Sequence, residues 1–288
     1  ASSYKADGKR FVMGFLVVDG QNKAFIVNRN FTISYIPIIV PDIYYLGTLL
    51  DVESISGLYL VFDCMYMTGK QCSKEFYPIR LDIARCMLKQ FVRTDVWKID
   101  EEIAKQDGTY DTVFLDWIIS QNNTDIRLKV KQIFRCGYIP KEKWIYPVDG
   151  IVWTSVVRTY KELSTTKLSV LKWKPREQIT FDFIVGGISR NVQKQLPATV
   201  SKYRFNTTQS KNTYPLLISE GSKSTFVFSS VDVGDVTIEE GKVYECYWKD
   251  KWVLGIQRKE KIFSNSLDTI LKTLDNIENT ITYSDIVS

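Results

Sequence analysis

Apolar and polar positions over the first 70 residues follow the short pattern of a β-sheet. Residues 11–18 form a mostly apolar run typical of a buried strand, Asp19 and Gly20 give a two-residue turn signal, and residues 24–27 are apolar again. Residues 46–53 and 57–67 repeat the pattern. The pattern predicts two strand pairs at the start of the chain.

A helical period follows these strands. Residues 78 to about 106 are predicted to be mainly helical, because Ile83, Met87 and Phe91 fall on one face and Asp82 is a candidate N-cap. Strands are predicted again over residues 145–157 and 167–173.

Beyond residue 176 the pattern changes to short apolar runs separated by polar and glycine turns. The runs cover residues 179–186, 200–205, 214–218, 224–231, 242–248 and 252–257. This spacing predicts a small β-barrel. Ser266 then begins an amphipathic helix, whose apolar side carries Leu267, Ile270, Leu271, Leu274, Ile277 and Ile281.

The patterns together predict an α+β protein in three parts. A catalytic body covers residues 1–176, a β-barrel covers 177–262, and a helix at 263–288 closes against the body. The chain of 288 residues, 44% hydrophobic and 25% charged, is long enough for one large domain or two.

Composition excludes several kinds of chemistry. The chain has no histidine, which removes histidine general bases, Ser-His-Asp and Cys-His arrangements and histidine-ligated zinc. A metal would need oxygen ligands, which favours Mg²⁺ or Mn²⁺.

The location of the protein is predicted from its cysteines and its hydropathy. Five cysteines form no CxxC pair and leave an odd count, so we interpret them as reduced thiols of an intracellular protein. No membrane association is expected, because the most apolar run, residues 35–50, is broken by Pro37, Pro41 and Asp42. The net charge of +5 fits a phosphate-rich partner, and equally a solvated basic surface.

Two basic segments carry the candidate chemistry. Residues 5–10 read KADGKR, which places Lys5 beside a turn that allows close backbone approach. Residues 171–175 read LKWKP, and a strand would send Lys172 and Lys174 to the same face. Because like charges disfavour an ammonium group, crowded lysines favour a nucleophilic amine. We therefore predict a covalent lysine–nucleotide enzyme, against the alternative of surface lysines on a solvated strand edge.

These segments resemble the motifs of covalent nucleotidyltransferases, a family that includes DNA ligases, RNA ligases and mRNA capping guanylyltransferases. Residues 5–10 match KxDGxR, and four further motifs follow in the family's order: residues 48–53 (TLLDVE, with Val52 in place of glycine), 59–64 (YLVFDC), 149–153 (DGIVW) and 171–175. LKWKP, YLVFD and the hairpin end IVNR at 26–29 look most like capping guanylyltransferases, and the divergence elsewhere resembles enzymes of large cytoplasmic DNA viruses.

The resemblance implies a fold and a reaction. The fold is a nucleotidyltransferase body of antiparallel sheets with helices (ATP-grasp-like, DNA ligase-like) followed by an OB-fold barrel. The reaction uses GTP to form lysyl-GMP, and GMP then passes to the 5′-diphosphate end of RNA. The alternative is a polynucleotide ligase that uses ATP and lysyl-AMP. A third alternative is an inactive nucleic-acid-binding scaffold on this fold.

The resemblance also implies a role for each motif residue. Lys5 would attack the α-phosphate, Lys172 and Lys174 would neutralise it, and Arg10 would hold the ribose. Glu53 and Asp149 would contact the ribose or the divalent ion. Phe62 and Val152 would flank the purine, and Arg29 would face phosphate. Residues 252–261 (WVLGIQRKEK) resemble the family's last motif, in which Arg258 and Lys261 would bind the β- and γ-phosphates when the barrel closes, although Ile256 and Glu260 depart from the family's pattern.

Only four residues precede Lys5, whereas family members usually carry several dozen there. We interpret the chain as part of a larger polypeptide, or as one that has lost those residues. In viral relatives an RNA triphosphatase precedes this region and a cap methyltransferase follows, so fusion to or association with both is expected.

Overall fold

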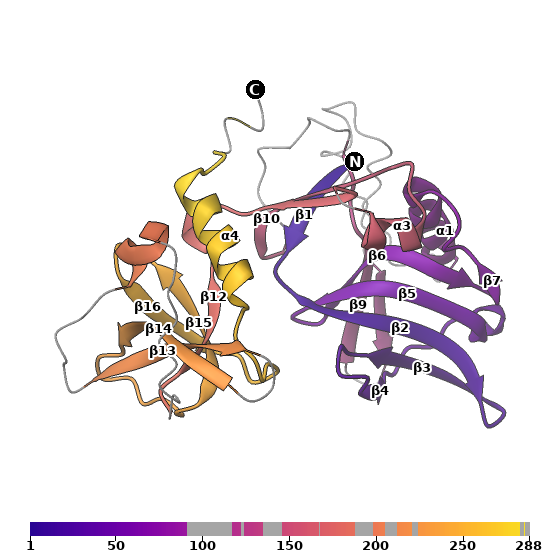
Figure 1. Ribbon diagram of the computed structural model, residues 1–288. Coiled ribbons are helices and arrows are strands. Elements are labelled where there is room, and N and C mark those ends of the chain that lie inside the picture. The colour runs from indigo at the N-terminus through magenta and orange to yellow at the C-terminus, as the bar shows by residue number, and fades with distance from the viewer. Residues whose placement is uncertain are drawn as a thin grey trace. The chain divides into compact units, whose positions relative to one another are not determined.

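The computed structural model describes residues 1–90, 117–121, 124–134, 146–166, 168–187, 198–204, 212–220, 224–282 and 285. These residues form two compact units, Ala1–Trp173 and Lys174–Ile286, which are drawn in Figure 1. The domain boundaries predicted from the sequence stay a prediction. No helix in the described parts of the chain is long and apolar enough to cross a membrane.

The first unit is built on an eight-stranded sheet. Its strands are β2 (Lys9–Val18), β3 (Gln21–Val27), β4 (Ile33–Tyr35), β5 (Leu46–Ile55), β6 (Leu58–Met67), β7 (Lys70–Gln71), β8 (Trp117–Gln121) and β9 (Thr124–Val130). They run in the order β4-β3-β2-β5-β6-β9-β8, with β7 beside β6. Neighbours are antiparallel except for β6 and β9, which are parallel.

The two strand pairs predicted at the start of the chain are confirmed. Val18 pairs with Gln21, and the turn between them places Asp19 and Gly20 at φ 50° and 71°. Such angles at both central residues match the right-handed twist of a two-residue hairpin. Strands β5 and β6 also pair, from Leu49–Tyr66 to Ile55–Leu58.

Helix α1 (Tyr77–Lys89) begins one residue before the start predicted at residue 78. Its N-cap is Phe76, with Pro78 in the first turn, where proline is well tolerated. The prediction of Asp82 as N-cap is wrong, because Asp82 lies inside the helix and accepts a hydrogen bond from Arg85. The helix reaches Lys89, and the predicted continuation towards residue 106, with Phe91, lies outside the described residues.

The core of the first unit lies on one face of the sheet. Met13, Phe15 and Leu50 pack there with Met87 and Leu88 of α1. The segment around the 3₁₀ helix η1 (Asp42–Tyr45) adds Tyr44 and Tyr45 to the same cluster. The opposite face of the sheet is therefore left for the polar side chains of β2 and β5.

A three-stranded sheet completes the first unit and is drawn beside the larger one in Figure 1. It consists of β1 (Ser2–Ala6), β10 (Val148–Thr154) and β11 (Val170–Trp173), in the order β1-β10-β11. Strands β10 and β11 are shorter than the predicted 145–157 and 167–173. A short helix, α3 (Tyr160–Thr165), connects them and starts with a capping box formed by Thr159 and Glu162.

The second unit contains a five-stranded antiparallel sheet. Its strands run in the order β14 (Ser224–Asp232), β13 (Thr213–Glu220), β12 (Phe181–Val185), β15 (Lys242–Trp248) and β16 (Trp252–Gln257). The end strands β14 and β16 contact each other, but within the described residues no ladder of hydrogen bonds closes the sheet. The protein is thus a mixed α+β structure with few helices, and the OB-fold stays a prediction.

Two further elements of the second unit are 3₁₀ helices, η2 (Arg176–Gln178) and η3 (Ala198–Tyr203). Helix η3 replaces the strand predicted at 200–205, so that prediction is wrong. Tyr203 is buried here and forms two hydrogen bonds with residues far along the chain. Its hydroxyl donates to Glu278 (2.6 Å), and its carbonyl oxygen accepts from the indole N–H of Trp252 (2.8 Å).

Helix α4 (Leu267–Glu278) confirms the predicted amphipathic helix. Ser266 caps it by accepting a hydrogen bond from the backbone N–H of Thr269. Ile270, Leu274 and Ile277 are buried in the core of the second unit, together with side chains such as Phe183 and Trp252. Ile281 lies beyond the end of the helix and is exposed, so it does not extend the buried side.

Candidate active site

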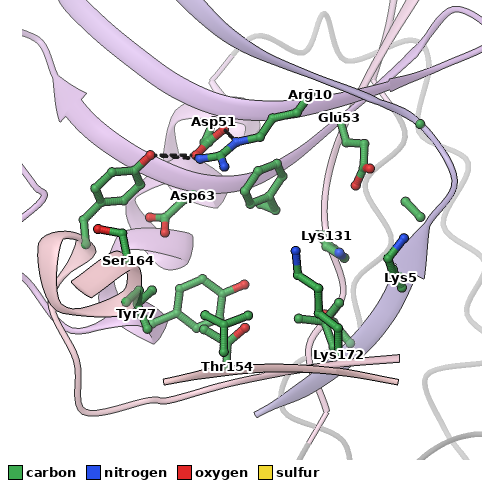
Figure 2. A pocket seen from close by; sticks show the side chains of 18 of the residues that line it. Lys5, Arg10, Asp51, Glu53, Asp63, Tyr77, Lys131, Thr154, Ser164 and Lys172 are labelled. Carbon is green, nitrogen blue, oxygen red and sulfur yellow. Dashed lines mark hydrogen bonds and ion pairs between the residues drawn. The ribbon is translucent and has the colours of Figure 1, made fainter. Parts of the chain in front are cut away.

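A pocket of about 530 Å³ opens within the first unit. This volume lies in the range of small-molecule sites. Seven of the residues singled out in the sequence line it: Lys5, Arg10, Arg29, Glu53, Phe62, Val152 and Lys172. They lie between positions 5 and 172 of the chain, most of them on strands of the two sheets. Figure 2 shows several of them facing one space.

Lys5 lies on β1 and reaches across to β10. Its Nζ atom donates to both carboxylate oxygens of Asp149, at 2.6 and 2.8 Å. The turn after β1 brings the backbone close to β5, because a Cβ atom on Gly8 would lie 2.7 Å from the carbonyl oxygen of Ser54. The close approach predicted for the KADG segment is therefore present.

Three lysines line the pocket, and one of them, Lys131, was not predicted from the sequence. Lys5, Lys131 and Lys172 point into it from separate segments, as Figure 2 shows. Lys131 is only 7% exposed, and burial lowers its pKa to about 8, with Glu53 opposing the shift. The pKa of Lys172 is also lowered, first by burial and then by the charge of Lys5.

Glu53 and Asp149 are the acidic groups beside these lysines. Burial raises the pKa of Glu53, while the charges of Lys131 and Lys5 oppose the shift. Within the described residues no group of three or more Cys, Asp or Glu side chains is placed to hold a metal by itself. Two carboxylates nevertheless fit the way Mg²⁺ is commonly bound, by one or two carboxylates together with substrate phosphates and water.

Arg10 is held in the pocket by a buried acid. Its Nε donates to Oδ1 of Asp51 at 2.8 Å, and its Nη2 bonds to Oδ2, a paired geometry that fixes the guanidinium plane. The Tyr160 hydroxyl closes the group by donating to Asp51 (2.8 Å) and accepting from Arg10 (3.2 Å). Asp51 is fully buried whereas the Arg10 side chain is 48% exposed, so the far side of Arg10 remains open to a ligand.

Phe62 lies beside two cations. The Cζ atom of Arg10 is 5.5 Å from the centre of its ring, and Nζ of Lys131 is 5.8 Å from the same point. Both distances are within the range of cation–π attraction. Val152 lines the same pocket from β10, where it pairs with Ser3 on one side and Lys172 on the other.

A buried ion pair supports the wall next to Phe62. Arg80 of α1 is fully buried and binds Asp63 through two hydrogen bonds of 2.6 and 2.8 Å. The same guanidinium donates to the carbonyl oxygens of Glu75 and Arg158. It therefore ties β6, α1 and the segment before α3 together.

Three predicted residues belong to the second unit. Strand β11 ends at Trp173, and Lys174 is the next residue. The prediction that Lys172 and Lys174 share the face of one strand is therefore wrong for Lys174. Arg258 pairs with Glu245 (3.1 Å) and Glu260 (2.7 Å), and Lys261 pairs with Asp182. Their phosphate contacts stay a prediction.

Comparison with known proteins shows the family of this chain. Residues 1–176 match the family described as mRNA capping enzyme, catalytic domain, and the chain belongs to this family. It is 23% identical over 265 residues to the mRNA-capping enzyme subunit alpha of Schizosaccharomyces pombe. That match covers 85% of this chain and 60% of the yeast protein, so the chain spans less than two thirds of its relative's length.

Proposed function

We propose that the protein is an mRNA guanylyltransferase that works through a covalent lysyl-GMP intermediate. The observation that carries the proposal is the position of Lys5, in a pocket of nucleotide size with two further lysines and a carboxylate partner. Family membership supports the same activity.

The first step joins Lys5 to the nucleotide. The neutral amine of Lys5 attacks the α-phosphorus of GTP, a P–N bond forms, and the bond to the bridging oxygen of pyrophosphate breaks. Lys5 must lose a proton for this attack. Asp149 is within direct hydrogen-bond reach of that proton and is the proposed acceptor.

The second step transfers GMP to RNA. A terminal oxygen of the RNA 5′-diphosphate attacks the same phosphorus, the P–N bond breaks, and the electron pair returns to Lys5. The product is a 5′–5′ triphosphate cap. Lys131 and Lys172 would stabilise the charge that develops on the phosphoryl oxygens in both steps.

The nucleoside would lie further along the pocket. Arg10, fixed by Asp51, would hold the ribose, and Phe62 and Val152 would contact the base. Arg29, at the pocket rim, would face phosphate. In the second unit, Lys174, Arg258 and Lys261 would meet the triphosphate when the units close, provided that Arg258 and Lys261 exchange their carboxylate partners for phosphate.

A divalent ion, Mg²⁺ or Mn²⁺, would neutralise phosphate charge when bound with the nucleotide. Glu53 and Asp149 are the residues that would hold it. Viral origin, intracellular location, the OB-fold and association with RNA triphosphatase and cap methyltransferase also belong to this proposal as expectations from the sequence.

The nucleotide that labels the protein separates capping from ligation. The chain is incubated with Mg²⁺ and either α-labelled GTP or α-labelled ATP, and denatured protein is assayed for bound label. Label from GTP alone, released onto 5′-diphosphate RNA, is expected. Label from ATP alone would instead support the ligase, and no label from either would support an inactive scaffold.

A further inference from the structure

The pocket side of the large sheet continues past the pocket to the edge of the sheet. Arg10 lines the pocket, and Val12 is on the same side of β2 because side chains alternate along a strand. Val12 pairs with Val27 of β3, and Val27 pairs with Ile33 of β4. Paired residues of antiparallel strands share a face, so this side runs without interruption from the pocket to β4.

This outer stretch carries exposed apolar side chains. Phe25 pairs with Tyr35, which continues the row formed by Val27 and Ile33. Ile33 is 60% exposed and Tyr35 is 64% exposed. We call Phe25, Val27, Phe31, Ile33 and Tyr35 the apolar shelf. Figure 1 shows β3 and β4 at one edge of the sheet.

The turn between β3 and β4 joins the shelf to the pocket. The Asn28 side chain accepts hydrogen bonds from the backbone N–H groups of Asn30 (2.9 Å) and Thr32 (3.0 Å). Within this braced turn Arg29 lines the pocket, whereas Phe31 is 86% exposed and has a φ of 59°. A bulky residue rarely adopts that angle. The turn thus presents a phenyl ring to solvent next to the pocket rim.

The charges around the shelf indicate what covers it. Nζ of Lys23 lies 5.9 Å from the centre of the Tyr35 ring, and Arg29, two residues before Phe31, lines the pocket. Exposed aromatic rings interleaved with cations are typical of surfaces that bind single-stranded nucleic acid, since bases stack on the rings and phosphates meet the cations. An apolar protein partner would not need this charge.

We propose that the apolar shelf binds the first nucleotides of the acceptor RNA, with bases stacked on Phe31 and Tyr35 and the backbone near Lys23. This inference rests on the proposed function, because it assigns a surface to the substrate of the second step. The shelf would guide the diphosphate end past Arg29 towards Lys5. It would have no role in the reaction with GTP.

The test separates the two steps. Phe31→Asn and Tyr35→Ser remove the rings, and asparagine accepts the left-handed backbone at position 31, so the turn is preserved. Lysyl-GMP is formed first from GTP and isolated. Transfer is then measured to 5′-diphosphate RNA of about ten nucleotides and to a nucleoside 5′-diphosphate, which has no following bases. Leu168→Asn is the matched control, because Leu168 is also an exposed apolar residue (81%) with a left-handed φ of 62° outside the shelf.

We expect each shelf variant to raise the KM for RNA at least about fivefold, with the KM for the nucleoside diphosphate and the rate of lysyl-GMP formation unchanged. Leu168→Asn should behave as the wild type does. Normal lysyl-GMP formation with an unaltered KM for RNA in both shelf variants would overturn the proposal that the shelf binds RNA. The proposed function would stand, and a protein partner for this edge of the sheet would be favoured. Absence of any lysyl-GMP in the wild type would overturn the proposed function itself.

Discussion

Nζ of Lys5 lies 2.6 Å from Oδ1 of Asp149, across the pairing of β1 with β10. Asp149 is also within 2.8 Å through its second oxygen, so a single side chain holds the lysine amine in place. The two side chains are only 23% and 13% exposed. In the proposed mechanism Asp149 therefore orients Lys5 and accepts its proton, in addition to helping to hold a divalent ion.

Asp149→Asn should therefore slow lysyl-GMP formation at least about 10²-fold, because the amide keeps the shape of the side chain but accepts a proton poorly. Single-turnover labelling with GTP measures the rate. The thermal unfolding midpoint checks that the fold is retained. An unchanged rate in a folded variant would remove Asp149 from the mechanism.

The ion pair between Asp63 and Arg80 should matter chiefly for stability. Asp63→Asn leaves a fully buried guanidinium without its charge partner, and we expect a loss of about 3–5 kcal/mol in the free energy of unfolding. Asp82→Asn, which removes the partner of Arg85 on the exposed side of the same helix, should cost about 1 kcal/mol or less. Urea titration compares the two variants, and similar losses would contradict the structural assignment of the buried pair.

Lys131 should give the protein a pH-dependent stability. Its pKa is lowered from 10.5 to about 8 in the folded state, so between these values the unfolded chain binds more protons. Stability contributed by this site should rise as the pH increases from about 8 to 10. We expect the free energy of unfolding of the wild type to rise relative to that of Lys131→Met over this range. A constant difference between the two proteins would mean that Lys131 titrates normally.

Arg258 provides a test of the second unit. If it binds the leaving pyrophosphate, Arg258→Ala should reduce lysyl-GMP formation from GTP but spare transfer of GMP from a preformed adduct to RNA. Lys259→Ala, at the exposed neighbouring position, is the control. Equal slowing of both half-reactions would argue against a role in closure. No slowing of either would leave Arg258 with its ion pairs to Asp182, Glu245 and Glu260 as its role.

Local patterns predicted the elements whose causes are local. The hairpin at Asp19 and Gly20 needs only a turn that admits left-handed angles, and the helix after Ser266 needs only a cap and a 3.6-residue period. The segment at 200–205 was predicted wrongly because Tyr203 is held by hydrogen bonds to Trp252 and Glu278. Both residues lie far along the chain, so the local sequence pattern carries no sign of these contacts. Asp82 was misassigned because an acidic residue near a helix start resembles an N-cap, whereas the cap is Phe76, directly before the first turn that holds Pro78.

The site residues divide in the same way, into those predicted from local sequence and those placed by distant contacts. Motif residues such as Lys5 and Lys172 were found because their sequence context is distinctive. Lys131 was missed because it is one of 38 basic residues and sits in no motif. Strand β9 pairs in parallel with β6, which is distant in the sequence. Lys131 follows β9 directly, and its backbone N–H donates to the carbonyl oxygen of Val61 in β6, which brings the lysine to the pocket. The available signal was the alternation of Lys129 and Lys131 with apolar residues at the end of β9.

The central claim is that Lys5 forms the covalent bond to the nucleotide. The wild type, Lys5→Ala and Lys9→Ala are incubated with GTP and Mg²⁺, and intact-protein mass spectrometry with peptide mapping locates any added GMP. Lys9 is the matched control, an exposed lysine four positions along the same segment. We predict one acid-labile, base-stable GMP on Lys5 in the wild type and in Lys9→Ala, and none in a folded Lys5→Ala. Undiminished GMP on Lys5→Ala would place the nucleophile elsewhere and contradict the account.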